Sequence, residues 1–323
     1  KNEISFNVKN LEISVFHNGK LVSGPAKVGM KVDGRNLSEN AKLSGKPSKT
    51  AIPEGTFASS PVYKKGKVSL AANFVEVPLG DWAVELAARN DGVAYRLKTR
   101  MKGEITVEDE TFELKIPKTA RCHLNYTWMF GFEETIPTGQ AAKDVRIDGR
   151  GRKMIYLPLV FSAPDAGVTV ALTESDVFGY PNLYLKDDKT LPKDSDKASL
   201  VSTFSKWPSK TEFSGLTKEQ LEVSRKRHIK VKESSNYLVK TSGTRSFPWR
   251  VFSIAEKPSD LLSADIVWAL ATPQEKGSDF SWVKPGKVAW DWWNAFDNKG
   301  NAGCTTATYK RFIDFASKTG VEY

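Results

Sequence analysis

Near its C-terminal end the chain reads Trp282-Val283-Lys284-Pro285-Gly286-Lys287-Val288-Ala289-Trp290-Asp291-Trp292-Trp293-Asn294. This stretch decides the fold of the C-terminal part. Pro285-Gly286 is typical of a turn, because proline fixes φ and glycine adopts conformations that other residues avoid. The residues that follow predict a short buried strand over Lys287–Trp290, with Asp291 to Asn294 at its C-terminal end.

A helix and a second strand are expected after this strand. Thr305 and Thr306 are favoured residues for a helix N-cap, and Gly320 suits the left-handed position that ends a helix. Val321-Glu322-Tyr323 then resembles the start of a new strand. The buried face of the helix is expected to consist of Tyr309, Phe312, Ile313 and Ala316, which recur at helical spacing.

The order strand, helix, strand is that of a parallel β/α unit. Ligands of barrels built from such units bind at the C-terminal ends of the strands, and Asp291 and the two tryptophans after it lie there. Tryptophan offers an aromatic face to the C–H face of a pyranose, and aspartate or asparagine can bond its hydroxyls. Asp291, Trp292, Trp293 and Asn294 are therefore predicted to bind substrate, although packing in the core is the alternative for the tryptophans.

Residues 1 to 277 predict antiparallel β structure, because short alternating segments are separated by turn residues. Asn18-Gly19 supplies the two positive φ values of a type I′ hairpin. So many strands predict a large two-sheet sandwich. Besides the hairpin strands, strands are expected at Val68–Val77, Trp82–Ala88, Val93–Met101, Phe112–Ile116, Ile155–Phe161 and Val168–Leu172.

The polar stretch 271–279, which contains proline and glycine, predicts a domain boundary. We expect a sandwich domain over residues 1–277 and a second domain over residues 278–323. One strand, one helix and the start of another strand leave a parallel sheet with open edges. The second domain is therefore expected to be incomplete in this sequence.

Composition excludes several classes of protein. The 323 residues are 40% hydrophobic and 27% charged, which is ordinary for a globular protein. No stretch is apolar enough to span a membrane. The N-terminus enters the strand pattern directly, so an exported protein would be present here in its mature form. Cys122 and Cys304 lie far apart in sequence and suggest no disulfide framework.

The net charge of +10 raises the possibility of a polyanion partner, and steep loss of binding with added salt would reveal one. The densest basic run is Arg225-Lys226-Arg227-His228-Ile229-Lys230-Val231-Lys232. Its apolar residues alternate with lysines, as expected for a strand with one solvated face. Nearby glutamates interrupt the positive charge, so this pattern favours a solvated strand and no nucleic-acid partner.

Several stretches, taken in order, resemble glycoside hydrolase family 97, whose members place a large N-terminal sandwich, also called a super-sandwich, before a (β/α)8 catalytic barrel. The resemblance covers nearly the whole chain. The matching stretches are Arg89-Asn90-Asp91-Gly92-Val93-Ala94-Tyr95-Arg96, Leu157-Pro158-Leu159, Leu172-Thr173-Glu174-Ser175-Asp176, Tyr180-Pro181, Pro248-Trp249-Arg250-Val251, Asp260-Leu261-Leu262, Trp282 to Trp293, and Tyr309 to Ala316.

The resemblance implies that the chain is a sandwich followed by the first unit of a truncated TIM-type barrel. It also implies hydrolysis of α-glycosidic bonds in an oligosaccharide and a calcium ion held by carboxylates. Glu174 stands at the position of the ligand that the sandwich contributes, and carboxylate oxygen suits calcium. A surface glutamate is the alternative. Glu133 and Glu134 are weaker acidic candidates.

The family includes retaining α-galactosidases and inverting α-glucosidases, which share the acid and differ in the second carboxylate. These catalytic residues are expected after Tyr323, so none is assigned in this sequence. Asp291 favours the galactosidase, because the glucosidases carry a non-acidic residue there. A non-catalytic carbohydrate-binding module is the alternative of another class. A periplasmic or secreted location is expected, whereas the pattern gives no oligomeric state.

Overall fold

The computed structural model describes residues 1–59, 65–128, 137–147, 149, 152–192, 194–213, 229–273, 275, 277–290 and 305–323. These residues form two compact units. The larger comprises Lys1–Phe57 and Ser69–Thr272, and the smaller comprises Ala58–Val68 and Pro273–Tyr323. No helix among the described residues combines the length and the apolar character needed to cross a membrane.

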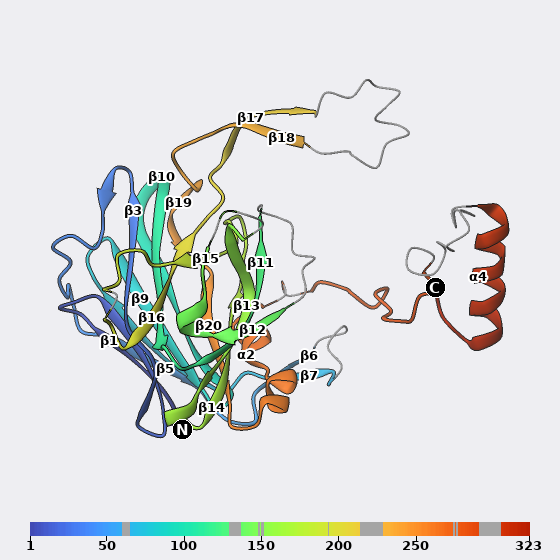
Figure 1. Cartoon of the computed structure of the whole chain (residues 1–323), viewed down its shortest axis with the longest axis horizontal. Coiled ribbons are helices and arrows are strands. Elements are labelled where there is room, and N and C mark those ends of the chain that lie inside the picture. Colours follow the sequence, from blue (N-terminus) through green and yellow to red (C-terminus); the bar gives the residue numbers. More distant parts are fainter. Residues whose placement is uncertain are drawn as a thin grey trace. The chain divides into compact units, whose positions relative to one another are not determined.

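The larger unit is built almost entirely of antiparallel strands, as the alternating pattern predicts (Figure 1). Its main sheet contains 16 strands. They are β1 (Asn2–Asn7), β2 (Glu12–His17), β3 (Lys20–Val32), β4 (Arg35–Asn36), β5 (Ser48–Ile52), β8 (Ala72–Pro78), β9 (Trp82–Arg89), β10 (Gly92–Pro117), β11 (Arg121–Thr127), β12 (Thr138–Ala141), β13 (Met154–Ala163), β14 (Val168–Ser175), β15 (Tyr184–Asp187), β16 (Lys197–Thr203), β19 (Val239–Ser246) and β20 (Trp249–Ala255).

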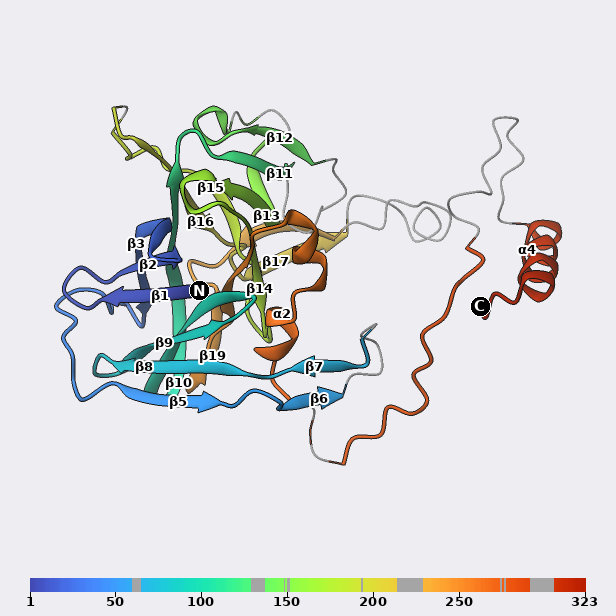
Figure 2. The same ribbon diagram turned by 90° about the horizontal axis from the view of Figure 1, so that it is seen from below.

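The long strand β10 joins the two layers of the sandwich. Its first part pairs with β9 and β20, and its later parts pair with β19, β3 and β16. Figure 2 shows β5, β8 and β9 side by side along one layer, with β11, β12, β13 and β15 gathered in the other. The separate strands expected at Val93–Met101 and Phe112–Ile116 are thus one strand. Its register shifts between Arg100 and Glu104, where Gly103 has φ of 72°.

The Asn18-Gly19 hairpin is confirmed. Asn18 has φ of 49° and Gly19 has φ of 74°, so both central residues of the turn adopt the left-handed region. The flanking strands β2 and β3 pair antiparallel, with His17 opposite Lys20.

The main core lies between the layers, and a second, smaller core lies on the opposite face of β9, β10 and β20. Residues that alternate along β10 divide between them: Tyr95 belongs to the main core and Ala94 to the smaller one. Ile266 and Leu270 pack on the smaller core and come from α2 (Ile266–Ala269) and the residue after it. The 3-10 helix η3 (Pro258–Ser263) precedes α2, and two others are η1 (Ala142–Asp144) and η2 (Pro164–Ala166).

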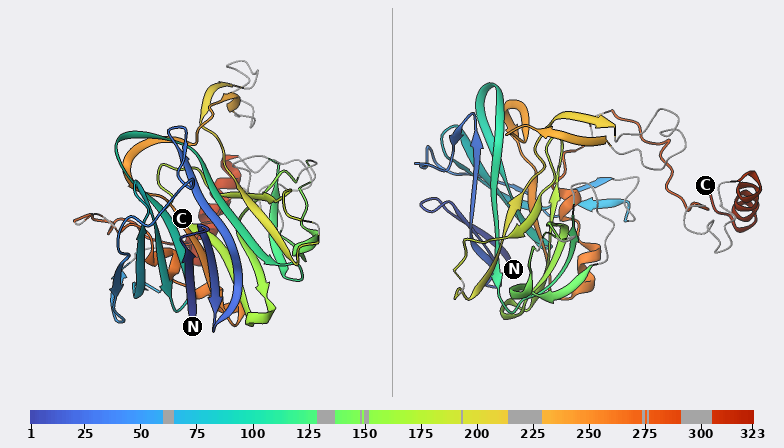
Figure 3. Two further views of the ribbon diagram at one scale, coloured as in Figure 1. Left: turned by 90° about the vertical axis from the view of Figure 1, so that its left-hand side faces the viewer. Right: turned by 45° about the horizontal axis from the view of Figure 1, so that its top comes forward.

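The remaining four strands form two separate two-stranded ribbons. β17 (Pro208–Phe213) pairs with β18 (Ile229–Ser234) and extends from the sandwich in Figure 3. Lys232 of β18 is exposed, as expected for a solvated strand face, and pairs with Glu212. Val231 is also exposed, although the alternating pattern predicts a buried position there. β6 (Phe57–Ser59) and β7 (Lys67–Ser69) form the other ribbon.

The smaller unit contains helix α4 (Thr306–Thr319), which begins and ends as the sequence predicts. The Thr305 side chain accepts a hydrogen bond from the Thr308 N–H, and Gly320 has φ of 69°. The expectation of a buried face is wrong, because no residue of α4 is buried and Ile313 is 67% exposed. The periodicity identifies an apolar stripe, but no described segment covers it.

The strand expected at Lys287–Trp290 is not regular in this structure. Two backbone hydrogen bonds nevertheless join this stretch to the end of the chain. The Tyr323 N–H donates to the Lys287 carbonyl at 3.1 Å, and the Ala289 N–H donates to the Tyr323 carbonyl at 2.7 Å. Tyr323 thus bonds through its N–H and its carbonyl to two residues that lie two positions apart, which is the pattern of parallel strand pairing. The barrel and the boundary at residues 277 and 278 stay predictions.

Candidate functional site

The C-terminal end of β14 places three consecutive polar residues, Glu174, Ser175 and Asp176, against three different segments. Glu174 bonds to β20, Ser175 to α2, and Asp176 to the chain that follows α2. The sequence predicts a strand only as far as Leu172, whereas β14 continues to Ser175. Glu174 is therefore paired within the sheet, opposite Arg250.

Glu174 belongs to a buried cluster with Arg250 and Glu110. The Arg250 guanidinium donates to Glu110 through Nε at 2.8 Å and Nη2 at 2.7 Å, and its Nη1 donates to Glu174 Oε1. The other oxygen of Glu174 accepts a hydrogen bond from the Leu183 N–H at 3.0 Å. The side chains of Arg250 and Glu110 are 1% and 2% exposed, whereas that of Glu174 is 10% exposed. Glu174 is thus the member closest to solvent.

The electrostatics of this cluster are unbalanced, because two carboxylates share one guanidinium. Burial raises the pKa of Glu174, and attraction by Arg250 and the Leu183 N–H offset this effect only in part. Burial alone would lower the pKa of Arg250, but the carboxylates of Glu110 and Glu174 together raise it, so the guanidinium stays charged. The ionised cluster carries a net charge of −1, an excess that a nearby cation would neutralise.

Asp176 fixes the chain as it leaves α2. Its carboxylate accepts hydrogen bonds from the Thr272 N–H at 2.8 Å and the Thr272 hydroxyl at 2.9 Å. Arg96 Nη1 lies 3.7 Å from the same carboxylate. Asp176 has φ of 62°, a left-handed conformation that aspartate tolerates better than most residues. Ser175 reinforces this attachment by donating to the Val267 carbonyl at 2.6 Å.

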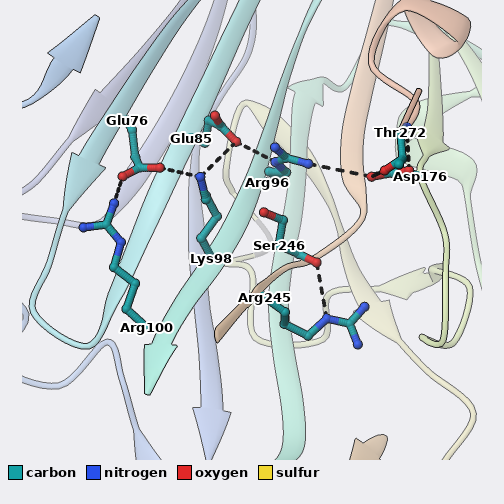
Figure 4. Close-up of polar contacts among 9 residues, drawn as sticks. All are labelled: Glu76, Glu85, Arg96, Lys98, Arg100, Asp176, Arg245, Ser246 and Thr272. Atoms are coloured by element: carbon teal, nitrogen blue, oxygen red, sulfur yellow. Dashed lines mark hydrogen bonds and ion pairs between the residues drawn. The ribbon is translucent and has the colours of Figure 1, made fainter. Parts of the chain in front are cut away.

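Arg96 connects Asp176 to a row of alternating charges across β10, β9 and β8 (Figure 4). Its Nε donates to Glu85 at 2.6 Å, and its guanidinium carbon lies 4.3 Å from the centre of the Trp249 ring. Lys98 bridges Glu85 and Glu76 at 3.8 and 2.5 Å, and Arg100 closes the row against Glu76. The row lies on the face of β10 opposite the main core, and it holds Arg96 against Asp176.

Of the site residues predicted from the sequence, only Glu174 lies in the described part of the chain. Glu174 is in the cluster just described. Asp291, Trp292, Trp293 and Asn294 lie outside the described residues, as do the weaker acidic candidates Glu133 and Glu134. The structure therefore does not test whether these residues share a site with Glu174.

A calcium ion implied by the family resemblance can be compared with the donor chemistry near Glu174. Calcium takes six to eight oxygen ligands. No group of three or more His, Cys, Asp or Glu residues that could hold a metal occurs in the described part of the chain. Each carboxylate oxygen of Glu174 accepts one hydrogen bond and has a second lone pair. The free lone pairs of Glu174 therefore fit a role as one calcium ligand, with the remaining ligands supplied by other parts of the protein.

Sequence reasoning assigned no role in the site to Glu110, Arg96 or Thr272. Glu110 lies within an alternating strand, where its period places it on the buried side beside Phe112, and a charged residue at a core position is the signal that could have identified it. Arg250 was noticed only as part of a matching stretch. A buried carboxylate requires a buried cation, so the two together predict an ion pair.

Residues 1–273 match the family model described as the N-terminal domain of glycosyl hydrolase 97. A retaining α-galactosidase of Bacteroides thetaiotaomicron is 33% identical over 97% of this chain and 46% of its own length. A probable retaining α-galactosidase of Streptomyces bingchenggensis is 22% identical over 97% of this chain and 42% of its own length. The chain thus spans less than half the length of these curated relatives.

Solved structures support the same fold. A glycoside hydrolase family 97 enzyme of Pseudoalteromonas sp. strain K8, in complex with acarbose, superposes with a TM-score of 0.74 and 22% identity, covering 99% of this chain and 45% of that one. A β-arabinopyranosidase superposes with a TM-score of 0.73 and 20% identity, covering 100% of this chain and 48% of that one. At these identities the likeness shows the fold alone.

Proposed function

Because this chain belongs to glycoside hydrolase family 97, we propose that the protein hydrolyses terminal α-galactosidic bonds with retention of configuration. The observation that carries the proposal is the 33% identity, over 97% of this chain, to a protein named a retaining α-galactosidase. A barrel that begins near residue 278 is part of the proposal. It is supported by α4 and by the parallel hydrogen bonds of Tyr323.

In this proposal the residues of the chain bind and orient the sugar. Retention requires a carboxylate nucleophile and a carboxylic acid about 5 to 5.5 Å apart, and we place both beyond Tyr323. Asp291 accepts hydrogen bonds from sugar hydroxyls, and Trp292 or Trp293 packs on the C–H face of the ring. Glu174 serves as one calcium ligand. When bound, calcium would supply positive charge that polarises nearby oxygen atoms.

The activity is tested on the full-length protein with α-galactosides and α-glucosides, and NMR identifies the sugar anomer that forms first. We expect faster hydrolysis of α-galactosides and release of the α-anomer. Release of β-glucose from α-glucosides would instead identify an inverting α-glucosidase. A protein that binds these sugars without cleaving them would be a carbohydrate-binding module.

Asp291→Ala is expected to lower kcat/KM on α-galactosides about 5- to 150-fold, which corresponds to about 1 to 3 kcal/mol for a lost buried hydrogen bond. The loss on α-glucosides should be much smaller, because galactose and glucose differ in the orientation of one hydroxyl. Steady-state kinetics on both substrates measures the difference. Asp314→Ala, in the exposed helix α4, is the control. Equal losses on both substrates would show that Asp291 does not select galactose.

Glu174→Gln is expected to weaken calcium binding by the full-length protein, because an amide oxygen replaces a charged ligand. In calorimetric titration the dissociation constant should rise. The stabilisation by calcium, about 2.7 kcal/mol at 100 times the dissociation constant, should fall at a fixed concentration. Glu85→Gln is the matched control, since Glu85 is also ion-paired and its side chain is 15% exposed. An unchanged titration for Glu174→Gln would exclude the role as a ligand.

The same variant tests the raised pKa of Glu174 in the absence of calcium. The folded protein binds this proton more tightly than the unfolded chain, so the contribution of Glu174 to stability is largest at acid pH and is lost as pH rises through the folded pKa. Urea unfolding at several pH values should show this dependence in the wild type and a reduced dependence in Glu174→Gln.

A further inference from the structure

A pocket of about 490 Å³ opens in the sandwich beside the loop that follows β14, and we call it the Trp207 pocket. Three parts of the chain form it: the loop after β14, the residues at the start of β17, and β19 with the residue before it. It is lined by Gly179, Tyr180, Pro181, Ser205, Lys206, Trp207, Pro208, Leu238, Val239, Lys240, Thr241 and Arg245. Its volume lies in the range of small-molecule sites.

The charge of the lining has one sign. Lys206, Lys240 and Arg245 are cationic, and the lining contains neither aspartate nor glutamate. Lys206 is partly compensated, because its amine lies 3.9 Å from Asp109. The Lys240 amine lies 5.6 Å from the centre of the Tyr237 ring, an uncharged partner. The pocket therefore offers positive charge to a ligand.

Arg245 is held rigidly by neutral groups. Its guanidinium donates to Thr241 Oγ1 at 2.8 Å and to the carbonyls of Phe178 and Gly179 at 2.8 and 3.4 Å. Its Nε donates to the Ser246 carbonyl at 3.3 Å (Figure 4). Burial lowers the pKa of Arg245, and interactions with Tyr180 and Asp176 oppose this effect only in part. Asp176 is already engaged by Arg96 and Thr272, so Arg245 can still attract an anion.

Trp207 supplies an aromatic surface beside these charges. Trp207 is 53% exposed, although its backbone forms two hydrogen bonds. The Trp207 N–H donates to the Tyr237 carbonyl at 2.9 Å, and the Ser235 N–H donates to the Trp207 carbonyl at 2.8 Å. A half-exposed indole on a hydrogen-bonded backbone suits the apolar C–H face of a pyranose, since burial of that face needs no ordering of the backbone.

We propose that the Trp207 pocket binds a carbohydrate whose pyranose carries a negatively charged carboxylate or sulfate group. The sugar ring packs on Trp207, and its anionic group pairs with Arg245 and Lys240. A neutral sugar would leave the cations unused, and a bare anion would leave the indole unused. The cations and the indole together favour a ligand that carries both an anionic group and a sugar ring.

The test measures binding of trigalacturonate, galactose 6-sulfate, neutral α-1,4-galactotriose and inorganic sulfate to the full-length protein by calorimetry and ligand-observed NMR. We expect trigalacturonate to bind about tenfold or more tightly than galactotriose, because its carboxylates form charge-assisted hydrogen bonds. Added salt should weaken it. Preference for galactose 6-sulfate over trigalacturonate would identify a sulfated sugar as the source of the charge.

Two substitutions locate the binding. Trp207→Ala and Lys240→Gln should each weaken trigalacturonate binding about tenfold, the effect of losing one aromatic or ionic contact. Trp128→Ala and Lys31→Gln remove an exposed indole and an exposed lysine outside the pocket and should have no effect. Thermal melts verify that all four variants fold.

Three outcomes would overturn the proposal. Equal binding of galactotriose and trigalacturonate would exclude the charge selection, and inorganic sulfate binding as tightly as the sugars would exclude a role for the ring. No binding, or binding that Trp207→Ala leaves unchanged, would exclude a carbohydrate at this pocket. Since binding is the measured quantity, these outcomes are distinct from failure of the proposed galactosidase activity.

Discussion

Arg250→Leu is expected to lower the free energy of unfolding by about 3 to 5 kcal/mol, the loss typical when one member of a buried ion pair is removed. The substitution leaves Glu110 and Glu174 facing each other with no buried cation between them. Both carboxylates lose a charged donor, and leucine fills only part of the space of arginine. Urea unfolding at neutral pH measures the change.

Arg35→Leu is the matched control for Arg250→Leu, since it makes the same substitution in an exposed ion pair with Asp81. Such pairs contribute about 0 to 1 kcal/mol. The loss in Arg250→Leu should also shrink at acid pH, because protonation of Glu174, whose pKa is already raised, removes part of the repulsion. Similar losses for the two variants would mean that the buried cluster is energetically unimportant.

Gly92→Ala is expected to lower the free energy of unfolding by about 3 kcal/mol or more, because overpacking adds to a strained backbone. Gly92 has φ of 153°, and a Cβ atom there would lie 2.3 Å from the Phe252 carbonyl oxygen and 3.0 Å from Ser253 Cα. Both are backbone atoms of β20, which cannot withdraw without breaking its pairing with β10.

Gly103→Ala separates these two contributions. Gly103 has φ of 72°, but an added Cβ would meet no atom within 4 Å. Only the backbone strain of about 1 to 2 kcal/mol should remain. Chemical denaturation of both variants gives the comparison. If Gly103→Ala proved as destabilising as Gly92→Ala, the close approach of β10 and β20 would not explain the requirement for glycine.

Local patterns predicted local structure well. The Asn18-Gly19 turn, the Thr305 cap and the Gly320 end of α4 each depend on φ and hydrogen bonds within a few residues, and all three are as predicted. Periodicity also placed most strands of the sandwich, but the strand expected at Val68–Val77 is divided between β7, in a separate ribbon, and β8. It could not show that Val93–Met101 and Phe112–Ile116 form one strand, because polar residues between them could equally belong to a turn.

The candidate site was harder to predict, because its contacts join residues far apart in sequence. Glu110 and Arg250 are separated by 140 positions. Arg250 and Glu174 are separated by 76, and Asp176 and Thr272 by 96. Spacing along the chain carries no information about such pairs. The resemblance drew attention to Glu174, yet its ion pair with Arg250 became visible only when β14 and β20 were seen as neighbours in the sheet.

The bonds between Asp176 and Thr272 bear on how the sandwich could be produced alone as a recombinant fragment. A fragment that ends at Ala271 would lack both donors of Thr272, so the Asp176 carboxylate would lose two hydrogen bonds while its backbone stayed in a left-handed conformation. Its remaining ion partner, Arg96, would be shared with Glu85. The shortest self-sufficient fragment should therefore retain Thr272 and several residues after it.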